Sequence, residues 1–488
     1  MDGSALPELP AGWVWTRLGE VLGFIKGKKP KKLSLRSEDL AVPYINIEAF
    51  EKNVFEKFTD GKDVPLCDTN DVLIVWDGAR CGLVGRGVSG AIGSTLAKLD
   101  SYEINSAYLF YFLQTKYGYI NKRPRGVGIP HVEPDIFWNI PLPLPPLPEQ
   151  HRIAARIEEL FTSLDAGAEA LKKTQAQLKR YRQSVLKHAF EGELTKEWRE
   201  VHKEELEPAS VLLERIKEER KQHAKGKYKE LPPADTSDLL ELPEGWVWTR
   251  LGEVCDTTSG GTPLRSKKEY YGGSIPWLKS GELKDNIIYR SEESITKLGL
   301  ANSSAKIFPK DTLLIALYGA TVGKMGKLGI DAATNQAICG IFNKYSAFEE
   351  DYLFNYLSSY RDNLLKSRFG GAQPNISQDI VQNILAPLPP LPEQHKIVEE
   401  IERRFSVADE IGKTVDQSLK QSKRLRQSIL KKAFEGKLVP QDPTDEPAEL
   451  LLERIKAEKA KCEAEEKEKK MKNKKVNTKQ TRLMYNGK

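Results

Sequence analysis

The sequence predicts an α+β protein in which two related globular domains are joined by two long antiparallel helices. Three observations lead to this fold class. Blocks of sequence recur in the same order roughly 240 residues apart. The region between the first blocks of each copy mixes short strand-like runs with one aromatic-rich helical stretch. A heptad pattern of apolar residues then follows each of these regions. We expect the two copies to take up a pseudo-two-fold arrangement.

The duplication rests on four pairs of matching blocks. Each pair shares most of its residues, and the blocks keep the same order in both copies, which chance does not supply. With only two copies and so long a period, the chain is not a solenoid. The matching blocks are residues 9–21 and 242–254, 143–151 and 387–395, 182–192 and 426–436, and 207–217 and 446–456.

The regions between these blocks diverge. Residues 23–125 and 255–369 share little beyond Gly78-Ala79 and Gly82 in the first copy and Gly319-Ala320 and Gly323 in the second. Similar ends around dissimilar domains indicate a common frame that carries two different binding surfaces. Neutral drift of loops is the alternative, but the differences extend over whole domains.

Each divergent region has the pattern of an α+β domain. Residues 71–75 and 311–317 are apolar, strand-like runs bounded by turn formers. Residues 106–119 and 348–365 are the aromatic-rich stretches that we expect to be helical. The proline-rich segment that follows ends each domain, because proline fixes φ and cannot continue a helix.

A long helix is expected after each proline-rich segment. Residues 149–190 would extend at most about 63 Å at ~1.5 Å per residue. Because each helix can cover the apolar seam of the other, we infer an antiparallel pair; the alternative is two helices that each lie on their own domain. The first seam is Ile153, Ile157, Leu160, Leu164, Gly167, Leu171, Thr174, Leu178, Tyr181 and Val185, and the weaker second seam is Ile397, Ile401, Arg404, Ala408, Ile411, Val415, Ser418, Ser422, Leu425 and Ile429.

These elements divide the chain into six expected segments. A first globular domain (1–148) is followed by the first long helix (149–195) and by a central helix with a linker (196–240). A second globular domain (241–392) is followed by the second long helix (393–440). A C-terminal helix with a basic tail (441–488) ends the chain.

Charge is distributed unevenly along the sequence. The net charge is +6, from 75 Lys+Arg and 69 Asp+Glu. Residues 1–140 hold 17 basic and 17 acidic side chains, residues 241–386 hold 16 of each, and residues 456–488 hold 12 against 5. Both globular domains are therefore neutral. Any nucleic-acid contact must come from local patches of these domains, and we expect the tail to be a solvated helix end.

Motifs for catalysis are missing. Residues 319–325 resemble a phosphate-binding loop, but one residue is lacking between the glycines and Met325 replaces the required Ser or Thr. The six histidines lack metal-ligand spacing, and the five scattered cysteines lack a Cys-x-x-Cys pair. We also find no membrane-length apolar run and no signal peptide. We expect a non-catalytic cytoplasmic protein with no metal site and no cofactor.

Basic and amide side chains in both domains suit DNA contact. Guanidinium and ammonium groups bind phosphates and guanine edges, and amides pair with adenine. Each of these residues alone would be an ordinary surface or turn residue, so the prediction depends on their clustering. The candidates are Lys26, Lys28, Lys29, Arg80, Arg86, Lys122, Arg123 and Arg125 in the first domain, and Ser259, Arg265, Tyr318, Thr321, Lys324, Asn335, Gln336, Arg368, Gln373 and Asn375 in the second.

The arrangement resembles the specificity subunit of type I restriction–modification systems over essentially the full chain. The residues that carry the resemblance stand in pairs. They are Leu-Pro-x-Gly-Trp at 9–13 and 242–246, Pro-Leu-Pro-Glu-Gln at 146–150 and 390–394, Gln-Ser-(Val/Ile)-Leu at 183–186 and 427–430, and Ala-Phe-x-Gly-x-Leu at 189–194 and 433–438, with further matches at 196–199 and 451–456.

The resemblance implies a division of labour. Each domain would be a target-recognition domain that reads one half of a bipartite, asymmetric site in double-stranded DNA, and the helices would fix the gap between the halves. Two modification subunits would bring S-adenosylmethionine and adenine-N6 methylation. Two restriction subunits would bring ATP- and Mg-dependent translocation and cleavage. A free-standing DNA-binding regulator and a coiled-coil adaptor with no DNA role remain as alternatives.

Overall fold

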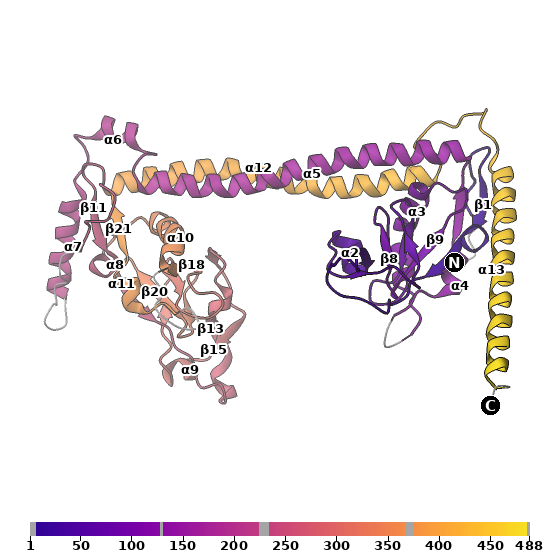
Figure 1. The fold of residues 1–488 in the computed structure, drawn as a ribbon. Helices are drawn as coiled ribbons and strands as arrows, with labels where there is room; N and C mark the ends of the chain where they lie inside the picture. Colours follow the sequence, from indigo (N-terminus) through magenta and orange to yellow (C-terminus); the bar gives the residue numbers. More distant parts are fainter. Residues whose placement is uncertain (1–5, 127–129, 224–233, 367–374, 486–488) are drawn as a thin grey trace. The chain divides into compact units, whose positions relative to one another are not determined.

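The computed structural model describes residues 6–126, 130–223, 234–366 and 375–485 (Figure 1). The chain forms two compact units. Unit 1 contains Met1–Leu171 and Gln417–Lys488, and unit 2 contains Lys172–Asp416. Each unit therefore combines one globular domain with one part of each long helix, so both copies of the repeat contribute to both units.

The globular domain of unit 1 is built on two four-stranded sheets. Their strand orders are β2-β9-β6-β7 and β4-β3-β8-β5. The expected strand at 71–75 is β6, and all four of its residues are buried. The strands are β2 (Gly23–Lys26), β3 (Val42–Ile45), β4 (Phe58–Thr59), β5 (Leu66–Cys67), β6 (Val72–Val75), β7 (Val84–Gly85), β8 (Gly90–Ile92) and β9 (Leu96–Asp100), with helices α1 (Leu18–Val21), α2 (Ile47–Lys52), α3 (Ser106–Asn121) and α4 (Pro134–Trp138).

The globular domain of unit 2 repeats this plan with one five-stranded and one four-stranded sheet. The strand orders are β12-β20-β17-β18-β14 and β15-β13-β19-β16. The strands are β12 (Asp256–Ser259), β13 (Tyr271–Leu278), β14 (Asn286–Ile288), β15 (Glu293–Ile295), β16 (Ile307–Phe308), β17 (Leu313–Ala316), β18 (Met325–Leu328), β19 (Ala332–Thr334) and β20 (Ile338–Phe342), with helices α8 (Leu251–Val254), α9 (Lys297–Ala301), α10 (Glu350–Lys366) and α11 (Gln378–Gln382).

The aromatic-rich stretches form the expected helices. They are α3 in unit 1 and α10 in unit 2. Tyr108 of α3 is fully buried and donates a hydrogen bond to the Pro143 carbonyl at 2.6 Å. Tyr352 of α10 does the same to the Pro387 carbonyl at 2.9 Å. These tyrosines tie each helix to the proline-rich exit of its own domain, and the predicted α+β class is confirmed.

The recurring end blocks pair with each other in space. Strand β1 (Val14–Arg17) runs antiparallel to β10 (Pro141–Leu144), and β11 (Val247–Arg250) runs antiparallel to β21 (Leu385–Leu388). The two blocks that bracket each divergent region therefore close it into a domain. This pairing explains why the ends of the two copies match while the regions between them differ.

The long helices are α5 (Leu147–Phe190) and α12 (Leu391–Phe434). They pack antiparallel within each unit, as predicted. In unit 1 Arg426 donates to the Asp165 carboxylate at 2.5 Å, and its guanidinium lies 4.2 Å from the centre of the Phe161 ring. In unit 2 the matching pair is Arg182 with Asp409. The two ion pairs are repeats of each other and join the two helices at matching positions.

The predicted heptad seam is wrong at four positions. Gly167, Tyr181, Ile411 and Leu425 are exposed, and in each case the next residue is the one turned inward. Arg182 and Arg426 are two of these inward residues. A helix has 3.6 residues per turn, so an apolar face drifts away from a strict seven-residue repeat. From residue 164 to residue 185 of α5, the inward residues are separated by steps of three and four residues that do not alternate strictly.

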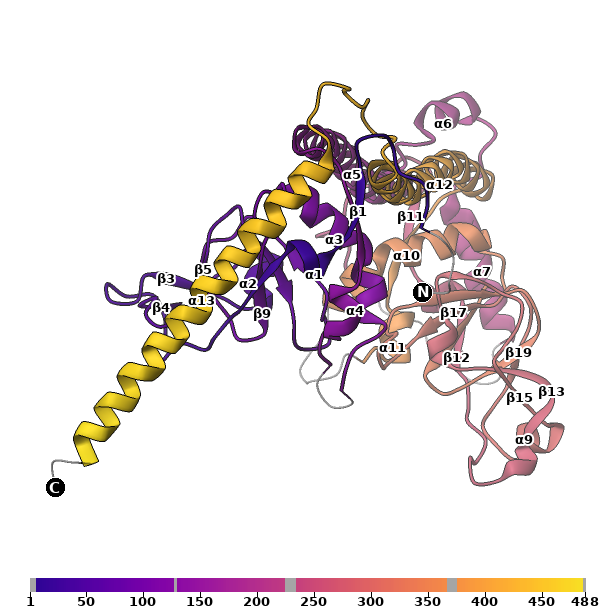
Figure 2. The same ribbon diagram turned by 90° about the vertical axis from the view of Figure 1, so that its right-hand side faces the viewer.

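Two more helices each pack on the globular domain that belongs to the other copy of the repeat. Helix α7 (Ala209–His223) begins in the last block of the first copy but packs on the unit 2 domain, where the Ala209 amide donates to the Gly245 carbonyl at 2.9 Å. Helix α13 (Ala448–Tyr485) begins in the last block of the second copy but packs on the unit 1 domain, where the Ala448 amide donates to the Gly12 carbonyl at 2.9 Å (Figure 2). Between α5 and α7 lies the short helix α6 (Lys196–His202).

Candidate nucleic-acid interface

Several loops of the unit 1 domain meet at one edge of its sheets. The amide of Gly27 donates to the Leu96 carbonyl at 2.9 Å, and that of Lys28 donates to the Ile92 carbonyl at 3.0 Å. Both bonds attach the loop after β2 to the turn before β9. A third loop joins them where Trp76 donates to the Thr95 carbonyl at 2.9 Å. We define the loop edge of unit 1 as residues 26–29, 76–82, 93–96 and the described part of 122–132.

Unit 2 forms the same edge with the same backbone hydrogen bonds. The amide of Gly260 donates to the Ile338 carbonyl at 3.1 Å, and that of Gly261 donates to the Thr334 carbonyl at 2.8 Å. Leu317 donates to the Ala337 carbonyl at 2.8 Å, as Trp76 does to Thr95. The loop edge of unit 2 is residues 259–262, 317–323, 335–338 and 375–376. Two dissimilar sequences therefore support one backbone frame.

In each loop edge, one glycine lies where its loop passes very close to the turn between two strands. A Cβ atom on Gly27 would lie 2.1 Å from the Gly93 carbonyl oxygen. A Cβ atom on Gly260 would lie 2.1 Å from the Thr334 hydroxyl oxygen and 2.3 Å from the Thr334 carbonyl oxygen. Only glycine allows the loop to lie against the turn at these distances.

The last contact of each frame is an isolated bridge. In unit 1 it joins Asp77 to His131, and in unit 2 it joins Tyr318 to Asn375. Each bridge brings the loop before the shared Gly-Ala pair against the segment that follows α3 or α10. Because the frames correspond, side chains at matching positions can be compared directly. The matched positions are Lys26 with Ser259, Asp77 with Tyr318, Arg80 with Thr321, Gly93 with Asn335, Ser94 with Gln336, and His131 with Asn375.

Several predicted cations of unit 1 lie at this edge with their charges available. Lys28, Lys29, Lys122 and Arg125 are exposed and form no ion pair with another described residue. Arg123 lies over the Tyr119 ring, 4.3 Å from its centre. Free ammonium and guanidinium groups of this kind bind phosphate oxygens.

Other predicted cations are paired with acidic side chains. Arg80 pairs with Glu51, and Arg86 donates to Glu158 of α5 at 2.7 Å, so Arg86 contacts the long helix instead of the loop edge. In unit 2, Arg265 pairs with Glu293 at 2.6 Å and Lys324 with Asp285 at 2.8 Å. These four charges are partly neutralised within the fold.

The unit 2 edge carries neutral polar groups. Thr262 donates to the side-chain oxygen of Gln336, and the buried Oδ1 atom of Asn335 has no hydrogen-bond partner among the described residues. Ser259, Tyr318, Thr321 and Asn375 lie on the same frame. Arg368 and Gln373, which were also predicted, lie outside the described residues.

Sequence reasoning missed Asp77 and His131. The Asp77 carboxylate accepts hydrogen bonds from Lys26 and, at 2.7 Å, from Nδ1 of His131. Burial acts to raise the pKa of Asp77, but the bonds from Lys26 and His131 outweigh it and hold the pKa below the ordinary 3.8. One signal was available, because Asp77 precedes the shared Gly78-Ala79 just as the selected Tyr318 precedes Gly319-Ala320.

Away from the loop edges, the described residues offer little for catalysis. No group of His, Cys, Asp and Glu side chains in the described ranges could hold a metal ion. Burial raises the pKa of both the Cys255 and the Cys339 thiol to about 12, so neither forms a nucleophilic thiolate near neutral pH. No described helix is long and apolar enough to cross a membrane.

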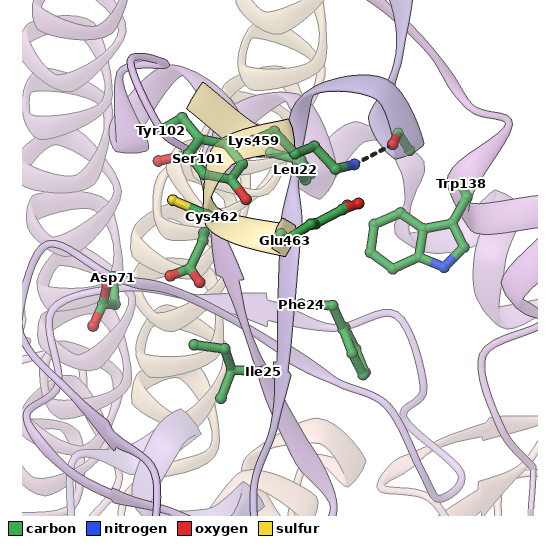
Figure 3. A pocket seen from close by; sticks show the side chains of 13 residues that line it. Leu22, Phe24, Ile25, Asp71, Ser101, Tyr102, Trp138, Lys459, Cys462 and Glu463 are labelled. Atoms are coloured by element: carbon green, nitrogen blue, oxygen red, sulfur yellow. Dashed lines mark hydrogen bonds between the residues drawn. The ribbon is translucent and has the colours of Figure 1, made fainter. Parts of the chain in front are cut away.

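A cleft of about 800 Å³ lies between α13 and the unit 1 domain (Figure 3). Phe24, Tyr102, Trp138, Lys459 and Cys462 are among the residues that line it. Lys459 donates to the Gly19 carbonyl and so holds α13 to helix α1. None of the predicted DNA contacts lines this cleft, so it is separate from the loop edge.

Comparisons with known proteins agree with this description. A family model described as "Type I restriction modification DNA specificity domain" matches residues 10–180 and 243–421. The type I restriction enzyme EcoDI specificity subunit of Escherichia coli is 28% identical over 477 residues, which cover 93% of this chain and 96% of that protein. The MjaVIII specificity subunit of Methanocaldococcus jannaschii is 26% identical over 443 residues, covering 88% and 94%.

A solved chain from work on complex assembly and conformational transition of the type I R-M system has the same fold. Its TM-score is 0.66 at 21% identity, and the match covers 89% of this chain and 100% of that chain. The family model matches well over half of the present sequence, once in each copy of the repeat. The DNA-specificity prediction is therefore favoured over a free-standing regulator or a coiled-coil adaptor. The chain belongs to the family of type I restriction–modification DNA specificity subunits, which recognise DNA sequence and are the non-catalytic components of these systems.

Proposed function

We propose that each globular domain reads one half of a bipartite, asymmetric DNA site through its loop edge. One observation carries this proposal: the two loop edges share their backbone hydrogen bonds but differ in side chains at every matched position compared above. A shared frame would present both edges in the same way to a duplex. Different side chains then read different bases, and the whole site is asymmetric.

The charges at the edges suit a reader that must discriminate. Lys28, Lys29, Lys122 and Arg125 would contact phosphates and position the unit 1 domain. Both domains are neutral overall, which keeps affinity for random DNA low, since non-specific binding follows the number of phosphates neutralised. Sequence would be read by the remaining polar side chains of the two edges.

The long helices would fix the spacing between the half-sites. Each of them has 44 residues and contributes one end to unit 1 and the other to unit 2. A continuous helix lengthens in defined steps of about 1.5 Å per residue. Half-site spacing is then a geometric property of the scaffold.

The chain would also be the scaffold on which the partners assemble. Two modification subunits would bring S-adenosylmethionine and methylate adenine at N6, and two restriction subunits would bring ATP- and Mg-dependent activity. Apolar side chains left exposed on the helices of unit 2 support partner packing: Val407 is 58% exposed, Ile411 43% and Tyr181 42%. The target adenine must leave the base stack to be methylated, so this chain would hold the duplex while a partner accepts the base.

The decisive experiment maps methylated adenines in the DNA of the host and of a strain in which this gene is deleted. We expect one bipartite motif to disappear when the gene is deleted. Replacing residues 255–385 with the corresponding domain of another family member should change one half of the motif and leave the other half intact. An adaptor with no DNA role would leave the motif unchanged, and methylation by the purified chain alone would contradict a non-catalytic reader.

The spacing proposal has its own test. An insertion after α5, near Gly192, would disturb unit 2, because a Cβ atom on Gly192 would already lie 2.4 Å from Pro243. Seven residues inserted after residue 171 in α5, together with seven after residue 416 in α12, extend both helices by about 10.5 Å. At about 3.4 Å per base pair the spacer should grow by about three base pairs while both half-sites stay the same. An unchanged spacer would contradict the proposal.

A further inference from the structure

We propose that Lys26, Asp77 and His131 form a specificity-determining cluster that reads one G·C base pair in the half-site of unit 1. This inference rests on the proposed function of the loop edge and assigns it a base class. The three residues come from separate segments. Lys26 ends β2, Asp77 follows β6, and His131 lies shortly before α4.

The cluster is held together but remains accessible. Asp77 accepts from Lys26 through Oδ2 and from His131 Nδ1 through Oδ1, the latter at 2.7 Å. The side chains of Lys26, Asp77 and His131 are 34%, 24% and 43% exposed. Their positions are therefore defined by each other, while each side chain stays partly exposed to solvent. A base-reading group needs both properties.

The hydrogen-bonding pattern of the cluster follows from the ionised Asp77. A carboxylate only accepts, so Nδ1 of His131 carries the proton of this hydrogen bond. In the tautomer whose single ring proton lies on Nδ1, Nε2 is an acceptor. Lys26 donates one N–H to Asp77 and keeps two. The cluster thus presents two donors beside one acceptor.

This pattern matches a G·C pair in the major groove. Guanine offers N7 and O6 as acceptors, and cytosine offers its N4 amino group as a donor. The two free N–H groups of Lys26 can bond N7 and O6, while Nε2 of His131 accepts from N4. In an A·T pair the positions of N6 and O4 reverse this order of donor and acceptor, and the same groups would be mismatched.

Unit 2 shows that the frame does not need this cluster. Ser259, Tyr318 and Asn375 occupy the matching positions, and the backbone bridge between Tyr318 and Asn375 forms without any carboxylate or cation among the three. The charged cluster in unit 1 is therefore not required to join the loops. We therefore assign the cluster a role in presenting hydrogen-bond donors and an acceptor to DNA.

The test transplants the unit 2 residues into unit 1, in the intact complex with its partner subunits. The variant is Lys26→Ser, Asp77→Tyr and His131→Asn, and the readout is the methylated motif and its tolerance of single base changes. We expect discrimination at one G·C position of one half-site to fall by about 5- to 150-fold, the range for one good base contact. The other positions of that half-site and the whole of the second half-site should be read as before.

Two further variants separate base reading from folding. Asp77→Asn keeps the shape of the side chain but removes the charge that orients Lys26 and His131, and it should weaken the same single position. Lys52→Ala on α2 removes an exposed cation paired with Glu48 and should leave the motif unchanged. Unaltered discrimination at every G·C position would overturn the proposal, and so would loss of the entire half-site together. If deleting the gene left the motif intact, the proposed function itself would fail instead.

Discussion

The indole nitrogen of Trp13 donates a hydrogen bond to the Glu149 carboxylate at 2.9 Å, and both side chains are buried. The bond joins the two recurring blocks, residues 9–21 and 143–151, that bracket the unit 1 domain. Its repeat is the bond from Trp246 to Glu393 at 2.8 Å. The two glutamates differ in their second partner. Glu393 forms an ion pair with Arg199, whereas Glu149 accepts a hydrogen bond from the uncharged Gln441 at 3.2 Å.

This difference predicts a pH-dependent stability in unit 1. Burial raises the pKa of Glu149 above 4.5, and the bond from Trp13 only partly offsets it. The folded state therefore holds a proton that the unfolded state has released, so stability falls as pH rises above about 4.5. We expect the advantage of the wild type over Glu149→Gln to shrink across this window, measured as local opening of β1 and β10 by hydrogen exchange. Trp13→Phe should steepen the trend, and an advantage that grows with pH would contradict the assignment.

Gly27→Ala should abolish reading of the half-site of unit 1, and Gly260→Ala should abolish reading of the half-site of unit 2. The new Cβ atom would meet the Gly93 carbonyl or Thr334 at 2.1 Å, and the loop must move away from its turn. Binding of the assembled complex to duplexes with one half-site altered measures which half is still read. Gly118→Ala in α3 and Gly281→Ala in unit 2 are matched controls, because no atom lies within 4 Å of the added group. Equal effects on both half-sites would argue against separate frames.

Removing a free cation from the unit 1 edge should weaken DNA binding without changing the motif. We expect Lys28→Ala, Lys29→Ala and Arg125→Ala each to reduce the slope of log K against log salt by about 0.9, since one phosphate contact is lost. Titrations at several salt concentrations, with specific and unrelated duplexes, check this. A changed ratio between the two duplexes would show that the residue reads bases instead of phosphates.

The Arg426–Asp165 pair between the helices should contribute modestly. The two side chains are 39% and 68% exposed, so solvent screens the pair, and a double-mutant cycle should give a coupling of about 0.3–1 kcal/mol. Arg426→Ala should cost more than Asp165→Ala, because it also removes the contact with the Phe161 ring. The double reversal Arg426→Asp with Asp165→Arg should recover part of the loss. A coupling near zero would mean that apolar packing alone sets the register.

Much of the architecture was predictable because it depends on local sequence patterns. Proline-rich exits, aromatic helices and repeated end blocks each depend on neighbouring residues, and β6 and α3 formed where expected. The helix seam was less predictable. A strict heptad placed Tyr181 and Leu425 inward, whereas the 3.6-residue turn carries the inward face to Arg182 and Arg426.

The repeat and its matching blocks are enough to identify the family, the two domains and the paired helices. They do not reveal which side chains share the loop edge. Asp77 and His131 are 54 positions apart and meet only because strand pairing and the frame of loops bring their segments together. The same holds for α7 and α13, each of which packs on the domain of the other copy. Contacts between distant segments depend on sheet register and helix docking, and neither composition nor a net charge of +6 determines these.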